Sequence, residues 1–586
     1  MTHCIAHNIS SPLGWTSEEN FAAVLQGRTK LTTHKDKWAL PQSFVASLFD
    51  DNAVEERFNS HVGDVGLALS RFEMLVVLSV KQAAEQAQIN LSSSDVGIVL
   101  ATTKGNVELL LPTNQPHIPR QRTLIAPSAA AIAHALGSPN TPHVVCNACI
   151  SGAHALLFAH RLLEMGQYRQ VVVCGCDVQS AFIVSGFQSF KAFSQAPCKP
   201  FDLYRDGLNL GEAAATMILS ATEPTTQRAW HIVGGAVRND AYHISSPSKK
   251  GEGCYRALVA TGVNDAENIA FVSAHGTATP YNDEMEAKAL HRAGLSAVPV
   301  NALKGIYGHT MGAAGVLETI LSMMSIEDRT VLPTIGFSEF GVSKPLLISA
   351  QAQPTSKRSF VKMLSGFGGC NVAMRWQWGE STANGNETQG QSKALPTLTP
   401  LRRVQITPQE VQIDGHTLAI DNPNGTLLTA IYKQWANDYP KFYKMDGLSR
   451  LAFAAGELLT KGTEGLPSMA LDDSAAIVFV GNSGSLASDI KYQGTIQQAD
   501  NFFPSPAHFV YTLPNIATGE LAIRHNVHGE TAFFIASQPH EAQMGTLLQS
   551  AAMDGEAKQV VGGWLEYEDD THFEVQITLY HVERGA

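Results

Sequence analysis

Short apolar runs alternate with longer amphipathic segments through the first two thirds of the chain. The runs at residues 96–100, 143–146 and 170–177 have strand length and little charge, whereas residues 72–87 and 152–165 repeat apolar side chains at helical spacing. Strands that are apolar throughout, instead of alternating, are typical of a mainly parallel sheet covered by helices on both faces. The pattern therefore predicts an α/β fold.

A second pass of the same kind begins near Trp230. The runs at residues 269–274 and 299–304 are expected to be strands, and each leads to a glycine-containing turn with a histidine, His275 and His309. The ends of such strands gather at one edge of an α/β sheet, where ligands bind. We therefore expect these histidines to share a site.

The last third of the chain begins after a change in composition. Residues 377–400 are rich in Gly, Asn, Gln, Ser and Thr and are predicted to be a flexible linker. Beyond them, a helix at residues 448–459 and a strand at 475–480 repeat the pattern of the first half of the chain. Residues 401–586 are therefore predicted to form an additional α/β domain.

Composition narrows the class of protein. The chain has 586 residues with 44% hydrophobic and 16% charged positions, which is typical of a globular protein with more than one domain. The net charge of −12 argues against nucleic acid as a partner. No signal peptide or membrane-spanning run is evident, and all eight cysteines lie at or before Cys370, so a reducing cytoplasm is expected.

Cys149 lies where the apolar run 143–146 gives way to a helical segment. Backbone N–H groups at a helix N-terminus favour the thiolate, so a lowered thiol pKa is expected here. One alternative is a buried structural thiol. Another is zinc or redox chemistry at Cys146-x-x-Cys149 and Cys174-x-Cys176, but residues 171–176 are expected to be a buried strand, where a metal would be hard to bind.

Five motifs occur in one order along residues 1–376. They are N-A-C-I-S-G around Cys149, P-F-D-x-x-R-D-G with its following G-E, S-A-H-G-T-A-T-P-x-x-D-x-x-E around His275, K-x-x-x-G-H-T-x-G-A-A-G around His309, and G-F-G-G-C-N at residues 366–371. Together they resemble the β-ketoacyl-acyl-carrier-protein synthase family, in its elongating Cys-His-His branch. The resemblance implies a thiolase-like α/β/α/β/α layered fold, with halves at about residues 1–245 and 246–376.

The resemblance also implies roles for individual residues. Cys149 would accept the growing acyl chain as a thioester, and His275 and His309 would stabilise the enolate formed when a malonyl thioester loses CO₂. Lys304 would organise the histidines, and the backbone N–H groups of Cys149 and Phe367 would form the oxyanion hole. A soft nucleophile and two neutral imidazoles suit this chemistry independently of the family.

Two further residues are expected to support this site. Glu318 lies in the helix after His309, and Gly368 lies in the glycine-rich turn that brings backbone N–H groups close to a ligand. No metal or other cofactor is expected, because the substrates would arrive on the phosphopantetheine of an acyl carrier protein. A homodimer or a pseudo-dimer through synthase domains is also expected.

The additional domain can be aligned with the first half of the synthase. A shift that places Gln170 on Gln559, 389 positions later, also places Cys149 on Gln538, so the nucleophile position would hold glutamine. This resembles the cysteine-free partner subunits called chain-length factors, which accompany synthases of aryl-polyene-type pathways. Residues 401–586 are therefore predicted to be a degenerate half-synthase fused to an intact one, adding a thiolase-like half-unit to the fold.

Three functions were weighed. Decarboxylative Claisen condensation of an acyl thioester with malonyl-carrier protein fits Cys149, both histidines and Lys304. An acyltransferase that does not decarboxylate would not need both histidines and the lysine. A non-catalytic chain-length-determining subunit conflicts with Cys149 in residues 1–376, but it is the preferred function of residues 401–586.

Overall fold

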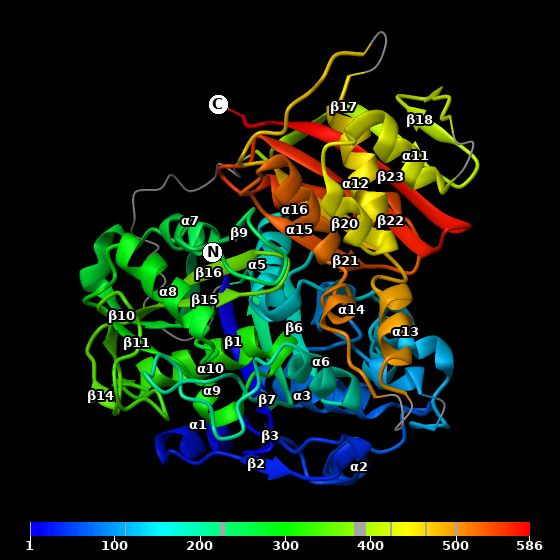
Figure 1. Cartoon of the computed structure of the whole chain (residues 1–586). Coiled ribbons are helices and arrows are strands. Elements are labelled where there is room, and N and C mark those ends of the chain that lie inside the picture. Colours follow the sequence, from blue (N-terminus) through cyan, green and yellow to red (C-terminus); the bar gives the residue numbers. More distant parts are fainter. Residues whose placement is uncertain are drawn as a thin grey trace.

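The computed structural model describes residues 2–111, 113–222, 229–379, 394–421, 425–462, 466–497 and 502–585. A large sheet system runs through the molecule, and the yellow-to-red C-terminal part lies against the blue-to-green N-terminal part (Figure 1). Within the described residues, no helix combines the length and the apolar character needed to cross a membrane.

The first half of the N-terminal part is a five-stranded mixed sheet. Its order is β5-β4-β6-β8-β1, with β4 parallel to β5 and β6, and β8 antiparallel to β6 and β1. The strands are β1 (His3–Ser10), β4 (Val96–Ala101), β5 (His143–Val145), β6 (Gln170–Asp177) and β8 (Ala213–Ser220). Helix α3 (Arg71–Ala87) packs on this sheet, as the apolar spacing of residues 72–87 predicted.

The second half continues the sheet in the order β9-β16-β15-β10-β11-β13. Its strands are β9 (Ala229–Asn239), β10 (Ile269–Ser273), β11 (Pro299–Asn301), β13 (Leu347–Ile348), β15 (Ser359–Ser365) and β16 (Cys370–Gly379). Helices α7 (Glu252–Ala260) and α8 (Pro280–Arg292) pack together on its outer side, α7 directly on β9 and β16.

A central helical layer joins the two halves. Helix α5 (Ser151–Glu164) follows Cys149, and helix α10 (Ala314–Glu327) follows the His309 turn; the two pack against each other. Glycine permits this close approach, because a Cβ on Gly315 would lie only 2.2 Å from the backbone nitrogen of Ala153. The order helix, sheet, helix pair, sheet, helix is the predicted thiolase-like layering.

The C-terminal part repeats the topology of the first half. Its sheet order is β21-β20-β22-β23-β17, with the same parallel and antiparallel pairings as β5-β4-β6-β8-β1. The strands are β17 (Thr397–Ile406), β20 (Ala476–Gly481), β21 (Thr531–Ile535), β22 (Gln559–Asp569) and β23 (His572–Glu583), with β18 (Val411–Ile413) and β19 (His416–Thr417) extending the β17 edge. Helices α12 (Gly447–Thr460) and α16 (Glu541–Ala552) pack on this sheet.

Shorter elements complete the described residues. In the N-terminal part they are α1 (Ser17–Leu25), β2 (Leu31–His34), β3 (Phe44–Ser47), α2 (Ala53–His61), α4 (Ile125–Leu136), α6 (Ala181–Ser189), β7 (Leu210–Gly211), α9 (Lys304–Tyr307), β12 (Thr330–Val331) and β14 (Gln353–Pro354). In the C-terminal part they are α11 (Leu427–Ile431), α13 (Leu486–Gly494), α14 (Pro506–Val510) and α15 (Ile516–His525).

The two parts join through one continuous sheet. Strand β21 pairs antiparallel with β5, with Phe534 opposite Val145 and Ile535 opposite Val144. The Cys146 N–H then donates to the Phe533 carbonyl at 3.0 Å. This pairing covers the β5 edge, which would otherwise present unpaired backbone groups just before the Cys149 turn.

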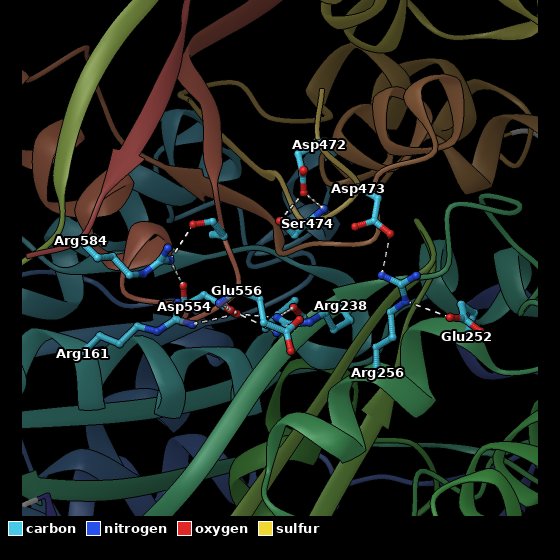
Figure 2. A network of polar contacts seen from close by, with 12 residues as sticks. Arg161, Arg238, Glu252, Arg256, Asp472, Asp473, Ser474, Asp554, Glu556 and Arg584 are labelled. Carbon is cyan, nitrogen blue, oxygen red and sulfur yellow. Dashed lines mark hydrogen bonds and ion pairs between the residues drawn. The ribbon is translucent and has the colours of Figure 1, made fainter. Parts of the chain in front are cut away.

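Buried charges also cross the junction (Figure 2). Arg238 of β9 donates to Asp554 at 2.5 Å and to Glu556 at 3.0 Å, and Arg161 of α5 donates to Glu530 at 2.8 Å. Because the two arginines are buried, they depend on carboxylates that the C-terminal part supplies.

The predicted linker boundaries are corrected. Residues 377–379 continue β16 and residues 397–400 belong to β17, so the ends of the predicted linker are paired strands; residues 380–393 lie outside the described residues. Strand β9 pairs with β1 of the first half and with β16 of the second half, so the predicted division near residue 245 stays a prediction.

Candidate active site

Cys149 lies in a tight turn between β5 and α5. A 3-10 turn covers Ala148–Ile150, and Ala148 adopts a left-handed φ of 48°. Ser151 fixes the turn from inside, since its Oγ accepts from the Asn147 N–H at 2.8 Å and donates to the Ala148 carbonyl at 2.6 Å. The turn therefore presents the thiol at the sheet edge, partly accessible among buried neighbours.

The predicted lowering of the thiol's pKa is wrong. Burial raises the pKa of Cys149 to about 12, against the opposing effects of the Lys304 ammonium and of the N–H groups of Cys149 and Phe367. Desolvation by the surrounding residues outweighs the helix N-terminus here, because burial disfavours the charged thiolate more than the nearby N–H groups and ammonium favour it. The Cys149 thiol is therefore neutral at physiological pH.

His275 and His309 lie beside this thiol. One ring nitrogen of each histidine and the Cys149 sulfur all lie within 4.8 Å of one another, and the two ring centroids are 5.1 Å apart at an interplanar angle of 82°. Burial and the nearby lysines hold the pKa of both imidazoles well below the usual value. Both rings are therefore neutral at physiological pH.

Hydrogen bonds define how the histidines are held. Nδ1 of His309 accepts the Met311 N–H at 3.2 Å, so the ring proton is on Nε2, which has no partner among the described residues and is buried. Glu286 of α8 accepts the backbone N–H groups of His275 at 2.7 Å and of Gly276 at 2.8 Å. His309 can therefore donate a hydrogen bond to a ligand, and Glu286 holds the His275 turn in place through its backbone.

Lys304 belongs to a buried charge cluster behind the histidines. Its Nζ donates to the His275 carbonyl at 2.6 Å and to Glu318 at 2.8 Å. Lys362 of β15 donates to the other Glu318 oxygen at 2.5 Å and to the Ala274 carbonyl at 3.1 Å. One carboxylate thus bridges two ammonium groups, and both lysines hold the strand end that carries His275.

Lys362 is not among the site residues predicted from the sequence. Burial lowers the pKa of Lys362 to about 8, although Glu318 opposes this effect. The pKa of Glu318 itself is lowered by the two ammonium groups, although burial alone would raise it. A single lysine within the otherwise apolar run Ser359–Ser365 was the available signal, because such a charge needs a buried partner.

The glycine-rich turn between β15 and β16 faces the sulfur. A Cβ on Gly366 would lie 3.3 Å from the Cys149 nitrogen, and the N–H groups of Phe367 and Cys149 both lower the pKa of the Cys149 thiol, against the larger effect of burial. Gly368 and Gly369 have φ values of 88° and 73°, a region that favours glycine and lets the Phe367 backbone approach the thiol. Both N–H groups thus favour negative charge beside Cys149, and their role as an oxyanion hole stays a prediction.

A cavity of about 280 Å³ opens onto these groups. Phe187 and Phe190 form an apolar wall, whereas Thr277, Thr279 and Tyr281 lie on the polar side. Tyr281 is 79% exposed, which marks the mouth of the cavity. A long, narrow acyl group could therefore enter past Tyr281 and reach the thiol.

The cysteine pairs do not form a metal site. Among the described residues, the His, Cys, Asp and Glu cluster with metal-binding spacing is Cys149, His275 and His309, and it includes neither Cys146 nor the cysteines of β6. All eight cysteines are free thiols, and Cys146, Cys174 and Cys176 are fully buried.

The strand register agrees with the 389-position shift. Val171 of β6 and His143 of β5 pair with residues of the middle strand β4 that are two positions apart. Val560 of β22 and Ala532 of β21 pair with residues of the middle strand β20 that are also two positions apart. Gln538, the residue that this shift places on Cys149, lies in an exposed turn between β21 and α16. The structure brings it near neither histidine turn of the site.

Two domain families match this chain. "Beta-ketoacyl synthase, N-terminal domain" matches residues 5–224, and "Beta-ketoacyl synthase, C-terminal domain" matches residues 230–338. The 3-oxoacyl-[acyl-carrier-protein] synthase 2 of Vibrio cholerae is 29% identical over 404 residues, which cover 62% of this chain and 95% of the relative.

Solved structures extend the likeness to the whole fold. The structure titled "PfaC Keto synthase-Chain length factor" superposes with a TM-score of 0.77 at 15% identity, covering 100% of this chain and 78% of that one. A ketosynthase (ApeO) in complex with its chain length factor (ApeC) from Xenorhabdus doucetiae gives 0.55 at 21% identity, covering 64% of this chain and 97% of that one.

Fold and site thus define a thiolase-like condensing enzyme with a Cys-His-His centre. Since both domain families match in order and together span more than half of its length, the chain belongs to the β-ketoacyl synthase family.

Proposed function

We propose that this enzyme carries out decarboxylative Claisen condensation, joining an acyl group held on Cys149 to a malonyl thioester to give a β-ketoacyl thioester. The observation that carries the proposal is the pair of neutral imidazoles beside a buried thiol. An acyltransferase that does not decarboxylate has no evident use for a second imidazole and for the lysine pair that fixes it.

The first half-reaction loads the acyl group. The Cys149 sulfur attacks the thioester carbonyl, the oxyanion is held by the N–H groups of Cys149 and Phe367, and the thiol proton passes to a neighbouring neutral imidazole. The carrier's thiolate then leaves and takes up a proton. One C–S bond forms and one breaks.

The second half-reaction forms the carbon–carbon bond. A malonyl thioester loses CO₂, and the electron pair of the broken C–C bond forms an enolate. The enolate oxygen accepts hydrogen bonds from the free Nε2–H of His309 and from the His275 ring. Two neutral imidazoles stabilise the negative charge of the enolate by hydrogen bonds. A buried imidazolium would itself need an anionic partner, whereas a neutral ring does not. The enolate carbon attacks the acyl thioester, and the Cys149 thiolate leaves and is reprotonated.

The substrates in this proposal are carried by an acyl carrier protein. The depth of the thiol below the exposed Tyr281 suits delivery on a long flexible arm such as phosphopantetheine. No metal or redox cofactor takes part. The aryl-polyene setting stays a prediction, which is tested by comparing polyene and saturated primers for their rates of loading onto Cys149.

Intact-mass analysis tests the condensation. The purified protein should gain one acyl group from an acyl-carrier protein, on Cys149, and release CO₂ from malonyl-carrier protein. His309→Ala should still load the acyl group but slow decarboxylation by about 10²–10³-fold, because one donor to the enolate is lost. Normal CO₂ release by both His309→Ala and His275→Ala would overturn the assignment.

For residues 394–585 the proposed role is to shape the acyl pocket. Phe509 of α14 packs against Phe187 and Phe190, the wall of the cavity, with ring centroids 5.5 and 6.0 Å away. It also fills the space beside Gly186, where a Cβ would lie 2.1 Å from the Phe509 ring. The C-terminal part therefore backs the wall that an acyl chain would meet, as a chain-length-determining unit would.

Replacing Phe509 tests this role. Phe509→Ala should deepen the cavity and shift the product distribution toward longer chains, measured by mass spectrometry of the carrier-bound products. Phe509→Tyr, which keeps the ring, is the matched control and should retain the wild-type distribution. Identical distributions for all three proteins would contradict a pocket-shaping role. Because β21 already covers the β5 edge, the proposed assembly is an intramolecular pseudo-dimer, which light scattering should detect as a single chain.

A further inference from the structure

The C-terminal part contacts the glycine-rich turn of the active site directly. Asn515, the residue before α15, donates from Nδ2 to the Phe367 carbonyl at 2.7 Å. Asn515 is buried, and its Oδ1 has no partner among the described residues, so the side chain serves here as a donor. The contact therefore acts on the residue whose N–H faces the Cys149 sulfur.

Helix α15 also approaches this turn through a glycine. A Cβ on Gly519 would lie 2.5 Å from the Gly368 carbonyl oxygen, so only glycine fits against the turn in its present position. On the other side, the Gly368 N–H donates to the Ile244 carbonyl at 2.6 Å, and Asn239 donates to the Gly368 carbonyl at 2.8 Å. The turn is thus held between β9 and its following loop on one side and α15 on the other.

The N-terminal part has no counterpart of the pair Asn515 and Gly519. The 389-position shift aligns the C-terminal end of α4 with that of α15. The residues that end the two helices in a left-handed conformation, Gly137 and Asn526, are 389 positions apart. The same shift places Ala126 on Asn515 and Ala130 on Gly519. The donor and the glycine are therefore present only on the part that faces the Cys149 site.

We propose that Asn515 is a positioning residue, which holds the Phe367 backbone so that its N–H points at the reacting thioester oxygen. The catalytically degenerate C-terminal part thereby completes the oxyanion hole of the intact part. This role is additional to shaping the pocket, and it rests on the proposed function of the Cys149 site. It concerns acyl transfer, in which an oxyanion forms, and not the nucleophilicity of the thiol itself.

Two reactions of the same thiol separate these effects. Acyl transfer from a thioester needs the oxyanion hole, whereas alkylation by iodoacetamide displaces iodide and forms no oxyanion. Asn515→Ala should slow acyl loading of Cys149 by about ten- to a hundred-fold, part of the 10²–10³-fold that a whole donor is worth, with KM changed less than about twofold. The alkylation rate of Cys149 should fall far less than the loading rate, because burial, and not the Phe367 N–H, makes the largest contribution to the pKa of this thiol.

Three further variants complete the test. Asn515→Asp keeps the size but places a carboxylate against the Phe367 carbonyl, so it should be at least as slow as Asn515→Ala. Gly519→Ala, which presses on the Gly368 carbonyl, should also slow loading and spare alkylation. Asn526→Gly removes an exposed asparagine from the far end of the same helix, where glycine suits the φ of 53°, and should load at the wild-type rate.

The outcomes are distinct. Wild-type loading rates in both Asn515 variants, at unchanged melting temperature, would overturn the proposal. So would a parallel loss of loading and alkylation, since that would indicate general disruption of the Cys149 turn. Failure of the wild-type protein itself to load an acyl group would instead overturn the proposed condensing function.

Discussion

Two turns occupy equivalent places on either side of the molecular junction. The turn after β5 carries Cys149, among buried neighbours, and is held by Ser151 and by the C-terminal part, since Asn147 donates to the Thr531 carbonyl at 2.8 Å. The turn after β21 carries Gln538 and is exposed. Strands β5 and β21, which precede the two turns, pair with each other. The same strand-and-turn arrangement therefore carries a thiol beside two histidines on one side and an exposed glutamine on the other.

The comparison shows which features of the second part serve the first. Its own counterpart of the nucleophile is glutamine, yet it keeps Phe509 against the cavity wall and Asn515 on the Phe367 turn. It also supplies the carboxylates that neutralise Arg161 and Arg238. The second part therefore contacts the Cys149 site directly, and its proposed functions rest on these contacts.

Exchanging the two turn residues should have the largest effect. Cys149→Gln copies the second part into the first and should lower condensation at least about 10³-fold, because no thioester can form. Gln538→Cys should be alkylated by iodoacetamide but gain no acyl group from the carrier, since it has no histidine pair or N–H pair beside it. Carrier-dependent acylation of the new cysteine would show that the two turns are chemically equivalent.

The junction charges predict a smaller effect. Asp554→Ala removes the buried partner of Arg238 and leaves it with the exposed Glu556, so it should lower the free energy of unfolding by about 3–5 kcal/mol, measured by denaturant titration. Glu556→Ala is the matched control, because it contacts the same arginine but its side chain is 60% exposed against 6% for Asp554. It should cost less than about 1 kcal/mol. Equal losses would mean that burial does not govern this pair.

The pH dependence of alkylation distinguishes the two turns most finely. With a pKa raised to about 12, Cys149 stays a neutral thiol from pH 7 to 10, and its thiolate fraction rises about tenfold per pH unit throughout. An exposed cysteine in Gln538→Cys has an ordinary pKa of about 8.5, so its rate should level off above about pH 9.5. A plateau for Cys149 near neutral pH would instead indicate a resting thiolate.

Local sequence patterns were sufficient for much of the fold and the site. Apolar runs located the strands β4, β5, β6 and β10, because a strand buried on both faces has apolar residues at successive positions. Helical spacing located α3 and α5, because a helix buried along one stripe has apolar residues at every third or fourth position. Cys149, His275 and His309 could be found because each lies in a short motif at a strand end. Their convergence within 4.8 Å follows from the sheet topology that the same runs predict.

What the sequence could not provide depended on contacts between distant residues. The pKa of Cys149 is raised mainly by desolvation in the folded protein, which outweighs the local helix N-terminus that suggested a thiolate. Lys362 could be noticed in an apolar strand, but only the fold shows that Glu318 bridges it to Lys304. Asn515 lies 148 positions from Phe367, and the pairing of β21 with β5 brings them together. Tertiary structure decided these features because electrostatics and positioning depend on proximity in space, which no local pattern encodes.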